Sequence, residues 1–240
     1  MIVASHQADL LPYSGFWYKM AKADLFDLKI FDQFVDRGYQ RRVKMRGTWA
    51  SLPVTGKHKY APICEVRIDP VESPRALAQV IRGRYCGSRN WDKYGPMLVD
   101  SILSIHTDRL WHFNTELILL VRDVLGIRTP LSVSVATEGG GSVGLVSVLK
   151  TYGEPTYLSG TGARAYMGDC REFDEAGIPV IWSPHEPVTG DSILSVLMDY
   201  DDPMEIVLAE REVTPAEIVL PGSEGAPGEV VLPEREGATA

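Results

Sequence analysis

Short apolar segments that alternate with helical patterns are the feature that most constrains the fold of this chain. Apolar stretches with period-two alternation predict strands, and apolar residues spaced three or four apart predict helices. The predicted strands are 2–4, 25–31, 49–54, 63–68, 131–135, 156–158 and 180–182, and the predicted helices are 16–23, 75–85, 97–105, 110–124, 142–152 and 163–176. This order predicts an α/β fold with a mixed, mostly parallel sheet and helices on both faces.

Charge divides the chain into a domain over residues 1–202 and a tail over residues 203–240. The chain has 240 residues and a net charge of −8, a length that suits one domain with an appendage. From Asp201 to Ala240 there are ten acidic residues against two arginines, so residues 201–240 carry the whole excess.

The sequence Glu-Ile-Val-Leu, or Glu-Val-Val-Leu in the last copy, recurs in the tail every 12 residues, starting at Glu205, Glu217 and Glu229. Proline, glycine and acidic residues separate the copies. This composition predicts a low-complexity, partly disordered extension. The alternative is that one or two copies add a strand to a sheet edge.

The sequence predicts a cytoplasmic protein that does not contact membranes. No apolar run approaches the ~18 residues of a membrane-spanning helix, and no signal peptide precedes the first predicted strand. The three cysteines, Cys64, Cys86 and Cys170, are odd in number and far apart, which argues against a disulfide framework.

Polar residues follow the first two predicted strands at their carboxyl ends. His6 and Gln7 follow the first strand, and Asp32 and Gln33 follow the second. Ligands of open α/β sheets bind at this end of the strands, and histidine suits general acid or base catalysis near neutral pH. We expect His6 and Asp32 to be catalytic, with Asp32 orienting or assisting the histidine, and Gln7 and Gln33 to bind substrate. A structural histidine is the alternative.

A basic segment comes next: residues 37–59 contain seven lysines and arginines and no acidic residue. Arginine pairs with carboxylate or phosphate, and tyrosine stacks on planar ligands. We expect Arg37, Arg42 and Lys44 to bind the anionic group of a small-molecule substrate and Tyr39 to stack on it, and a solvated basic face is the alternative. The segment also leaves room for an aminoacyl-tRNA as donor, although a net charge of −8 disfavours general nucleic-acid binding.

Two segments resemble motifs of the WbqC-like protein family. The first is residues 6–16, His-Gln-Ala-Asp-Leu-Leu-Pro-Tyr-Ser-Gly-Phe, and the second is residues 31–44, which contain Phe-Asp-Gln-Phe and Arg-Gly-Tyr-Gln-Arg-Arg-Val-Lys. The later motifs of the family are matched by two further groups of residues. One is Asn114 ahead of Leu125-Gly126-Ile127, and the other is Tyr157-Leu158-Ser159-Gly160 with Tyr166 and Phe173. The resemblance covers roughly residues 1–200. Ala8, Arg41 and Val43 depart from the family pattern.

This resemblance implies a tailoring enzyme of surface-polysaccharide or natural-product biosynthesis. The expected reaction is transfer of an acyl or aminoacyl group onto an amine-bearing sugar or similar intermediate. Matched motif positions add Tyr13, Asn114, Ser159 and Gly160 to the expected substrate-binding residues.

Residues 158–164, Leu-Ser-Gly-Thr-Gly-Ala-Arg, also resemble a motif of Rossmann-like nucleotidylyltransferases. That likeness implies a Rossmann-like sheet, affinity for phosphate and a binding role for Arg164, although Phe16 stands where those enzymes carry a second histidine. Nucleotidylyl transfer from a nucleoside triphosphate is therefore one alternative function. A non-catalytic carrier of an anionic intermediate is another.

Three further features bear on ligands. No residue spacing matches a metal site. The sequence points to no particular cofactor or oligomeric state. The run Glu138-Gly139-Gly140-Gly141-Ser142 lacks the lysine of a phosphate-binding P-loop, so a flexible loop is predicted there.

Overall fold

A computed structural model describes residues 1–134, 136, 139–211 and 218–219. Its main sheet has six strands in the order β5-β2-β1-β6-β7-β8. The strands are β1 (Ile2–Gln7), β2 (Leu25–Lys29), β5 (Leu131–Val133), β6 (Thr156–Ser159), β7 (Val180–Trp182) and β8 (Ile218–Val219). The first five are parallel, and β8 is antiparallel to β7 at the edge. The predicted α/β fold with a mostly parallel sheet is confirmed.

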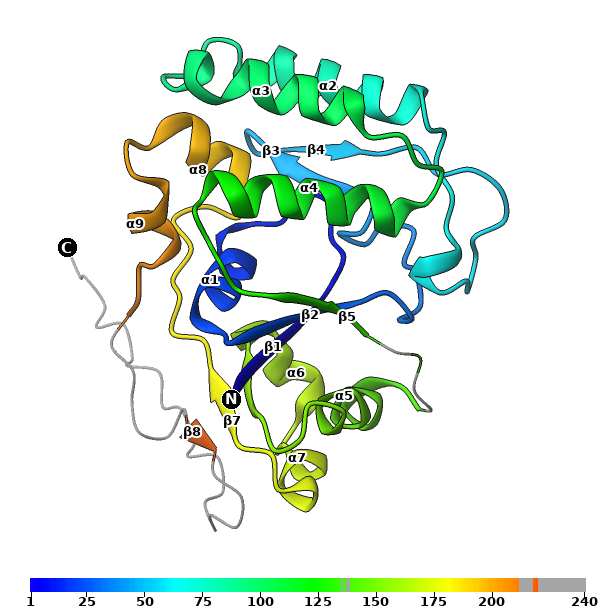
Figure 1. Cartoon of the computed structure of the whole chain (residues 1–240), viewed down its shortest axis with the longest axis vertical. Helices are drawn as coiled ribbons and strands as arrows, with labels where there is room; N and C mark the ends of the chain where they lie inside the picture. Colours follow the sequence, from blue (N-terminus) through cyan, green and yellow to red (C-terminus); the bar gives the residue numbers. More distant parts are fainter. Residues whose placement is uncertain (135, 137–138, 212–217, 220–240) are drawn as a thin grey trace, which may run out of the picture.

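Helices cover both faces of this sheet because its central strands alternate their side chains between two cores. In β1, Ala4 packs with α1 (Ser14–Lys22) and α4 (Leu110–Val124), whereas Val3 packs with the helices that cover the opposite face of the sheet. The opposite face is covered by α5 (Gly141–Lys150), α6 (Arg164–Met167) and α7 (Arg171–Ala176), as Figure 1 shows.

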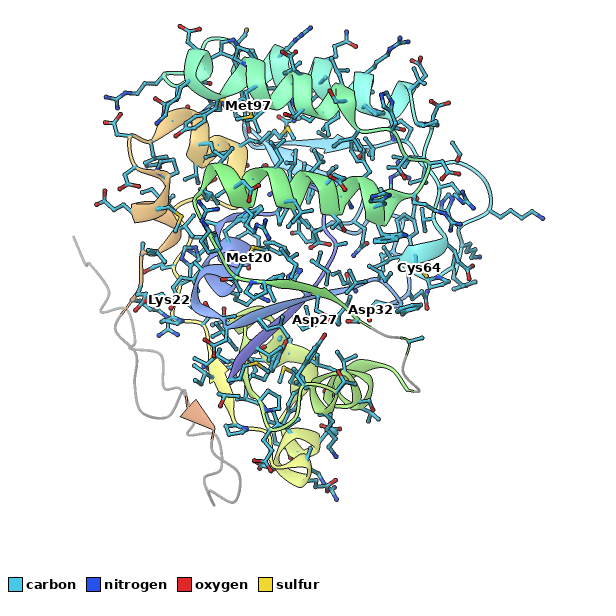
Figure 2. All side chains as sticks on the ribbon, in the orientation of Figure 1. Met20, Lys22, Asp27, Asp32, Cys64 and Met97 are labelled. Carbon is cyan, nitrogen blue, oxygen red and sulfur yellow. The ribbon has the colours of Figure 1, made fainter. Side chains whose placement is uncertain are left out.

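A second layer lies beyond α4 and contains the hairpin of β3 (Arg42–Met45) and β4 (Thr48–Ser51). Arg46 and Gly47 both have positive φ, 55° and 71°, so the hairpin turns through a two-residue loop suited to glycine. The layer also contains α2 (Glu72–Tyr85), α3 (Trp91–Ser104) and α8 (Ile193–Asp199). Side chains fill the space between these helices, the hairpin and the sheet (Figure 2).

Several predicted elements differ from the structure. The apolar pattern predicts a strand over residues 63–68, but this segment begins with the short 3-10 helix η1 (Ile63–Glu65), which buries Ile63 without sheet pairing. Residues 163–176 form two helices because the backbone has positive φ at Gly168 and Cys170, 57° and 61°. Helix α3 begins at Trp91, six residues before the predicted start, and contains Pro96 in its interior.

The chain continues to pack against the domain beyond residue 202. Helix α9 (Pro203–Val207) is capped by the Asp202 carboxylate and contacts α1. After it, Glu210 forms a 2.7 Å ion pair with Lys22 and accepts a 2.8 Å hydrogen bond from the Tyr18 hydroxyl.

The copy of the tail repeat that starts at Glu217 supplies β8, in agreement with the edge-strand alternative. Residues 212–217 and 220–240 lie outside the described part of the chain, so the predicted disorder stays a prediction. Among the described residues, no helix is long and apolar enough to cross a membrane.

Candidate functional site

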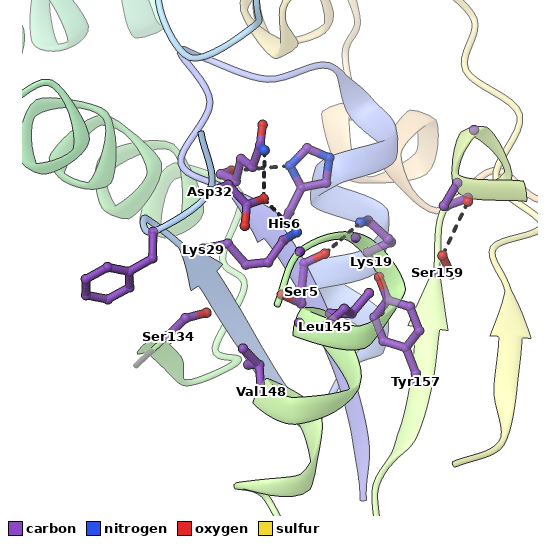
Figure 3. A pocket seen from close by; sticks show the side chains of 18 of the residues that line it. Ser5, His6, Lys19, Lys29, Asp32, Ser134, Leu145, Val148, Tyr157 and Ser159 are labelled. Atoms are coloured by element: carbon purple, nitrogen blue, oxygen red, sulfur yellow. Dashed lines mark hydrogen bonds and ion pairs between the residues drawn. The ribbon is translucent and has the colours of Figure 1, made fainter. Parts of the chain in front are cut away.

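A cavity of about 650 Å³ lies at the carboxyl ends of β1, β2 and β6. From β1 the chain runs to β2 and β5 on one side, and β6 and β7 lie on the other side. Such a reversal of strand order opens a crevice that binds ligands in α/β proteins. Figure 3 shows side chains from β1, β2, β6, α1 and α5 converging on this cavity.

His6 lies at the end of β1 and lines the cavity. Its Nδ1 is 3.2 Å from the Gln7 carbonyl oxygen, which only accepts hydrogen bonds, so Nδ1 carries the proton. The unprotonated Nε2 has no hydrogen-bond partner among the described residues. Burial, followed by the nearby Lys19 ammonium, lowers the pKa of His6 well below 6.5. The imidazole is therefore neutral at pH 7, with a free lone pair suited to accepting a proton.

Asp9 is the carboxylate beside His6. Its Oδ2 lies 3.5 Å from His6 Nδ1, and its buried Oδ1 has no hydrogen-bond partner in the described part of the chain. Burial raises the pKa of Asp9 to about 7, while Lys19 and Lys29 act in the opposite direction. Sequence reasoning missed Asp9. The only signal was an acidic residue inside the apolar run Ala8-Asp9-Leu10-Leu11.

Lys19 brings a buried amine to the cavity wall from α1. It is 5% exposed, and its Nζ donates a 3.3 Å hydrogen bond to the Ser5 carbonyl oxygen. Burial and then Lys29 lower the pKa of Lys19 to about 7, against a smaller opposite effect of Asp9. Sequence reasoning missed this residue as well, although a lysine between Trp17 and Met20 breaks the apolar face of the helix.

We expect Lys19→Met to raise the free energy of unfolding at pH 7 by about 1–2 kcal/mol, because methionine removes a buried charge. In the wild type, the folded-state pKa of about 7 is below that of the unfolded lysine, 10.5. The stability that Lys19 contributes is therefore complete above pH 10.5 and is lost as the pH falls toward 7. The advantage of the variant should shrink as the pH rises from 7.

Urea unfolding of both proteins near pH 7 and near pH 9.5 measures this difference. The matched control is Lys22→Met in the same helix, because Lys22 is 43% exposed and ion-paired with Glu210. A Lys19→Met protein less stable than the wild type at pH 7 would contradict the expectation.

Asp32 lines the cavity, and its hydrogen bonds go to residues other than His6. Its Oδ2 accepts hydrogen bonds from Gln7 Nε2 at 2.7 Å and from Lys29 Nζ at 2.8 Å. Gln40 in turn donates a hydrogen bond to Gln7 Oε1. Asp32 therefore anchors Gln7 and Lys29, and the orienting position that we expected for it is occupied by Asp9.

The structure brings together some of the other predicted residues and separates the rest. Tyr13, Gln33, Ser159 and Gly160 line the cavity. The remaining predicted binding residues, Arg37, Tyr39, Arg42, Lys44, Asn114 and Arg164, are not among the residues that line it. Arg42 and Lys44 belong to the β3–β4 hairpin, and the Arg164 guanidinium lies 5.0 Å from the Trp182 ring centroid.

Asn114 has a structural position. It is fully buried in α4, and its Nδ2 donates 2.7 Å hydrogen bonds to the carbonyl oxygens of Ala8 and Gln40. These bonds join the loop that follows β1 to the segment before β3, so Asn114 supports the cavity wall from behind.

We expect Asn114→Ala to lower the free energy of unfolding by about 2–3 kcal/mol, because two buried carbonyl groups lose their donor. Urea denaturation measures the change. Thr115→Ala is the control, since Thr115 is partly exposed and its hydroxyl bonds, among the residues described, only to the Trp111 carbonyl oxygen in its own helix. A loss below about 0.5 kcal/mol for Asn114→Ala would contradict this role.

The glycine run forms part of the cavity wall. Gly139, Gly140, Gly141 and Gly144 line the cavity at the amino end of α5, which has no side-chain cap. Gly139 and Gly141 have φ of 86° and 58°, a backbone conformation that favours glycine. Glu138 of the same run lies outside the described residues.

The model of the WbqC-like protein family matches residues 7–189. The chain belongs to this family. The matched part of the WbqC-like chain includes β2, β5, β6 and most of the residues that line the cavity. No curated protein and no solved structure matches the sequence. In the described part of the chain, no cluster of three or more histidine, cysteine, aspartate or glutamate side chains is arranged to hold a metal ion.

Proposed function

We propose that this WbqC-like protein is a transferase that moves an acyl or aminoacyl group onto the amine of a sugar or natural-product intermediate. The observation that carries the proposal is His6, a neutral imidazole with a free Nε2 on the wall of a 650 Å³ cavity. Acyl transfer to an amine needs such a base, because the attacking nitrogen loses a proton as the new bond forms.

In the proposed reaction, the amine nitrogen attacks the carbonyl carbon of the donor, and His6 Nε2 accepts the proton from that nitrogen. The bond between the carbonyl carbon and the leaving group then breaks, and the imidazolium returns the proton to the leaving group. Asp9, 3.5 Å from Nδ1, stabilises the imidazolium while it exists. The reaction as written balances without an oxidant or a reductant.

Lys19 and Lys29 supply the positive charge for an anionic group on the substrate or donor. Both line the cavity, and Lys19 uses one of its three N–H groups in a hydrogen bond that the structure describes. A bound carboxylate or phosphate stabilises the charged form of Lys19, which burial alone disfavours. Tyr13 and Ser159 add hydroxyl groups to the same wall.

A transfer assay on the full chain tests this function. The protein is incubated with an amino sugar and, in separate reactions, with an acyl-coenzyme A or an aminoacyl-tRNA, and mass spectrometry follows the acceptor. We expect the acceptor to gain the mass of the acyl group with one donor class. In a parallel reaction with ATP and magnesium, gain of a nucleoside monophosphate without acyl transfer would contradict this function and support nucleotidylyl transfer. The position of Arg164 outside the cavity disfavours that alternative.

A further inference from the structure

Part of the basic segment lies at the surface outside the cavity, with Arg37, Tyr39 and Trp49 exposed and with Arg42 and Lys44 partly buried. We call these five residues the hairpin face. We propose that the hairpin face binds a single-stranded segment of nucleic acid whose end reaches the cavity. The inference rests on the proposed function, since the strand would carry the group to be transferred.

The basic segment carries positive charge that nearby acidic residues leave largely uncompensated. Of the seven basic residues in 37–59, Arg41 is paired with Asp36 and Arg46 with Asp199. The other five form no ion pair with a described residue: Arg37, Arg42, Lys44, Lys57 and Lys59. The loop with Lys57 and Lys59 contacts the segment just before Arg37, because His58 Nε2 is 3.4 Å from Asp36 Oδ1. Clustered cations without acidic partners provide the electrostatic attraction that a phosphate backbone requires.

Two exposed aromatic rings among these cations form a surface on which bases can stack. Trp49 is 36% exposed and Tyr39 is 56% exposed, and their ring centroids are 5.8 Å apart. The Arg42 guanidinium lies 3.9 Å from the Trp49 centroid, and Lys44 Nζ lies 5.5 Å from it. Proteins that bind single strands stack bases on aromatic rings and arginine planes, while nearby cations contact the phosphates.

Strand pairing explains how this surface arises. Val43 and Met45 of β3 are buried, so Arg42 and Lys44 point to the other side, where Lys44 is opposite Trp49. Arg84 of α2 holds the hairpin by donating hydrogen bonds to the carbonyl oxygens of Met45, Thr48 and Trp49. These hydrogen bonds hold the hairpin, and with it the stacking surface, against α2.

The loop that follows β1 connects the hairpin face to the cavity. The carbonyl oxygen of Tyr39 accepts a 2.9 Å hydrogen bond from the amide of Leu10, which fixes Tyr39 on the loop that follows β1. Three residues further along that loop, Tyr13 is 39% exposed and lines the cavity. Trp49 contacts Tyr39, and the backbone of Tyr39 is bonded to the loop that carries Tyr13 to the cavity wall. A mononucleotide would cover one ring, whereas several rings and five cations suit a strand of several nucleotides.

Fluorescence anisotropy with a labelled single-stranded RNA of about 12 nucleotides tests the proposal on the full chain. We expect binding that weakens steeply as salt rises from about 50 to 200 mM. Lys44→Glu and Trp49→Ala should each weaken binding about tenfold, and Trp49→Phe, which keeps a stacking ring, should stay within about threefold of the wild type. Circular dichroism melting checks that each variant folds.

Arg75→Glu is the matched control, since Arg75 is an exposed arginine of α2 that pairs with Glu72 at 3.1 Å. It should leave the affinity within about twofold of the wild type. No binding of the RNA, or binding that Lys44→Glu and Trp49→Ala leave unchanged, would overturn the proposal. Equal affinity for ATP and for the RNA would also overturn it, because the hairpin face would then bind a single nucleotide.

The outcomes separate this inference from the proposed function. If the RNA does not bind but acyl transfer from a small donor requires His6, the inference about the hairpin face fails and the function stands. If the RNA binds and acyl transfer does not require His6, the function fails and the binding surface stands.

Discussion

Replacing His6 with glutamine is expected to lower kcat of the proposed transfer by about 10²–10⁴-fold. Glutamine preserves polarity and approximate size but accepts no proton at neutral pH, so the attacking amine would lose its base. The effect should fall on kcat more than on KM, because Lys19 and Lys29 still hold the anionic group. The mass-spectrometric transfer assay under saturating substrate measures the change.

His112→Gln is the control for loss of a histidine, because His112 is 49% exposed on α4 and is not among the residues that line the cavity. It should leave kcat unchanged. In the wild type, burial and Lys19 lower the pKa of His6, so the base form persists as the pH falls below 6.5. Loss of activity through protonation of His6 should therefore begin only below pH 6.5. A His6→Gln protein with nearly full activity would contradict the proposed role.

Replacing Asp27 with alanine is expected to lower the free energy of unfolding by about 3–5 kcal/mol. The carboxylate is fully buried in β2 and accepts hydrogen bonds from Ser5 at 2.9 Å, Ser134 at 2.5 Å and the Tyr152 hydroxyl at 2.7 Å. Figure 2 labels Asp27 within the sheet. Its removal leaves the hydroxyls of Ser5 and Ser134, both residues of the cavity wall, without their acceptor, while the Tyr152 hydroxyl keeps a 3.0 Å hydrogen bond to Ser132 Oγ.

Urea denaturation measures this loss, and Tyr152→Phe is the graded comparison. That variant removes one hydrogen bond to the carboxylate and keeps the ring, so it should cost only about 1 kcal/mol. An Asp27→Ala protein destabilised by less than about 1 kcal/mol would show that the buried network contributes little to the free energy of folding.

The sheet was predictable from sequence because its strands are short apolar runs. Segment 25–31 alternates apolar with polar residues, and segment 156–158 contains no charged residue. Strands that are buried between two layers of helices require such apolar sequences. The β3 strand escaped prediction because Arg42 and Lys44 occupy its outer, partly buried side. This segment forms a strand because it pairs with β4 and packs under α2. The sequence of the segment itself does not show these tertiary contacts.

The site was predictable in the part that depends on strand ends. His6 and Asp32 lie at the cavity because parallel strands deliver the residues that follow them to one edge. Asp9 and Lys19 were missed because a charged residue in an apolar run gives no local indication that tertiary packing buries it. Arg42 and Lys44 were expected at the cavity because they are close to Asp32 in sequence, but the hairpin carries them to a separate surface.

The protonation state of His6 tests the central claim most directly. Nuclear magnetic resonance of ¹⁵N-labelled histidine, with His6→Gln to assign the signals, reports both the tautomer and the titration midpoint. We expect a neutral ring at pH 7 that carries its proton on Nδ1 and titrates well below 6.5. An imidazolium at pH 7, or a neutral ring protonated on Nε2, would contradict it.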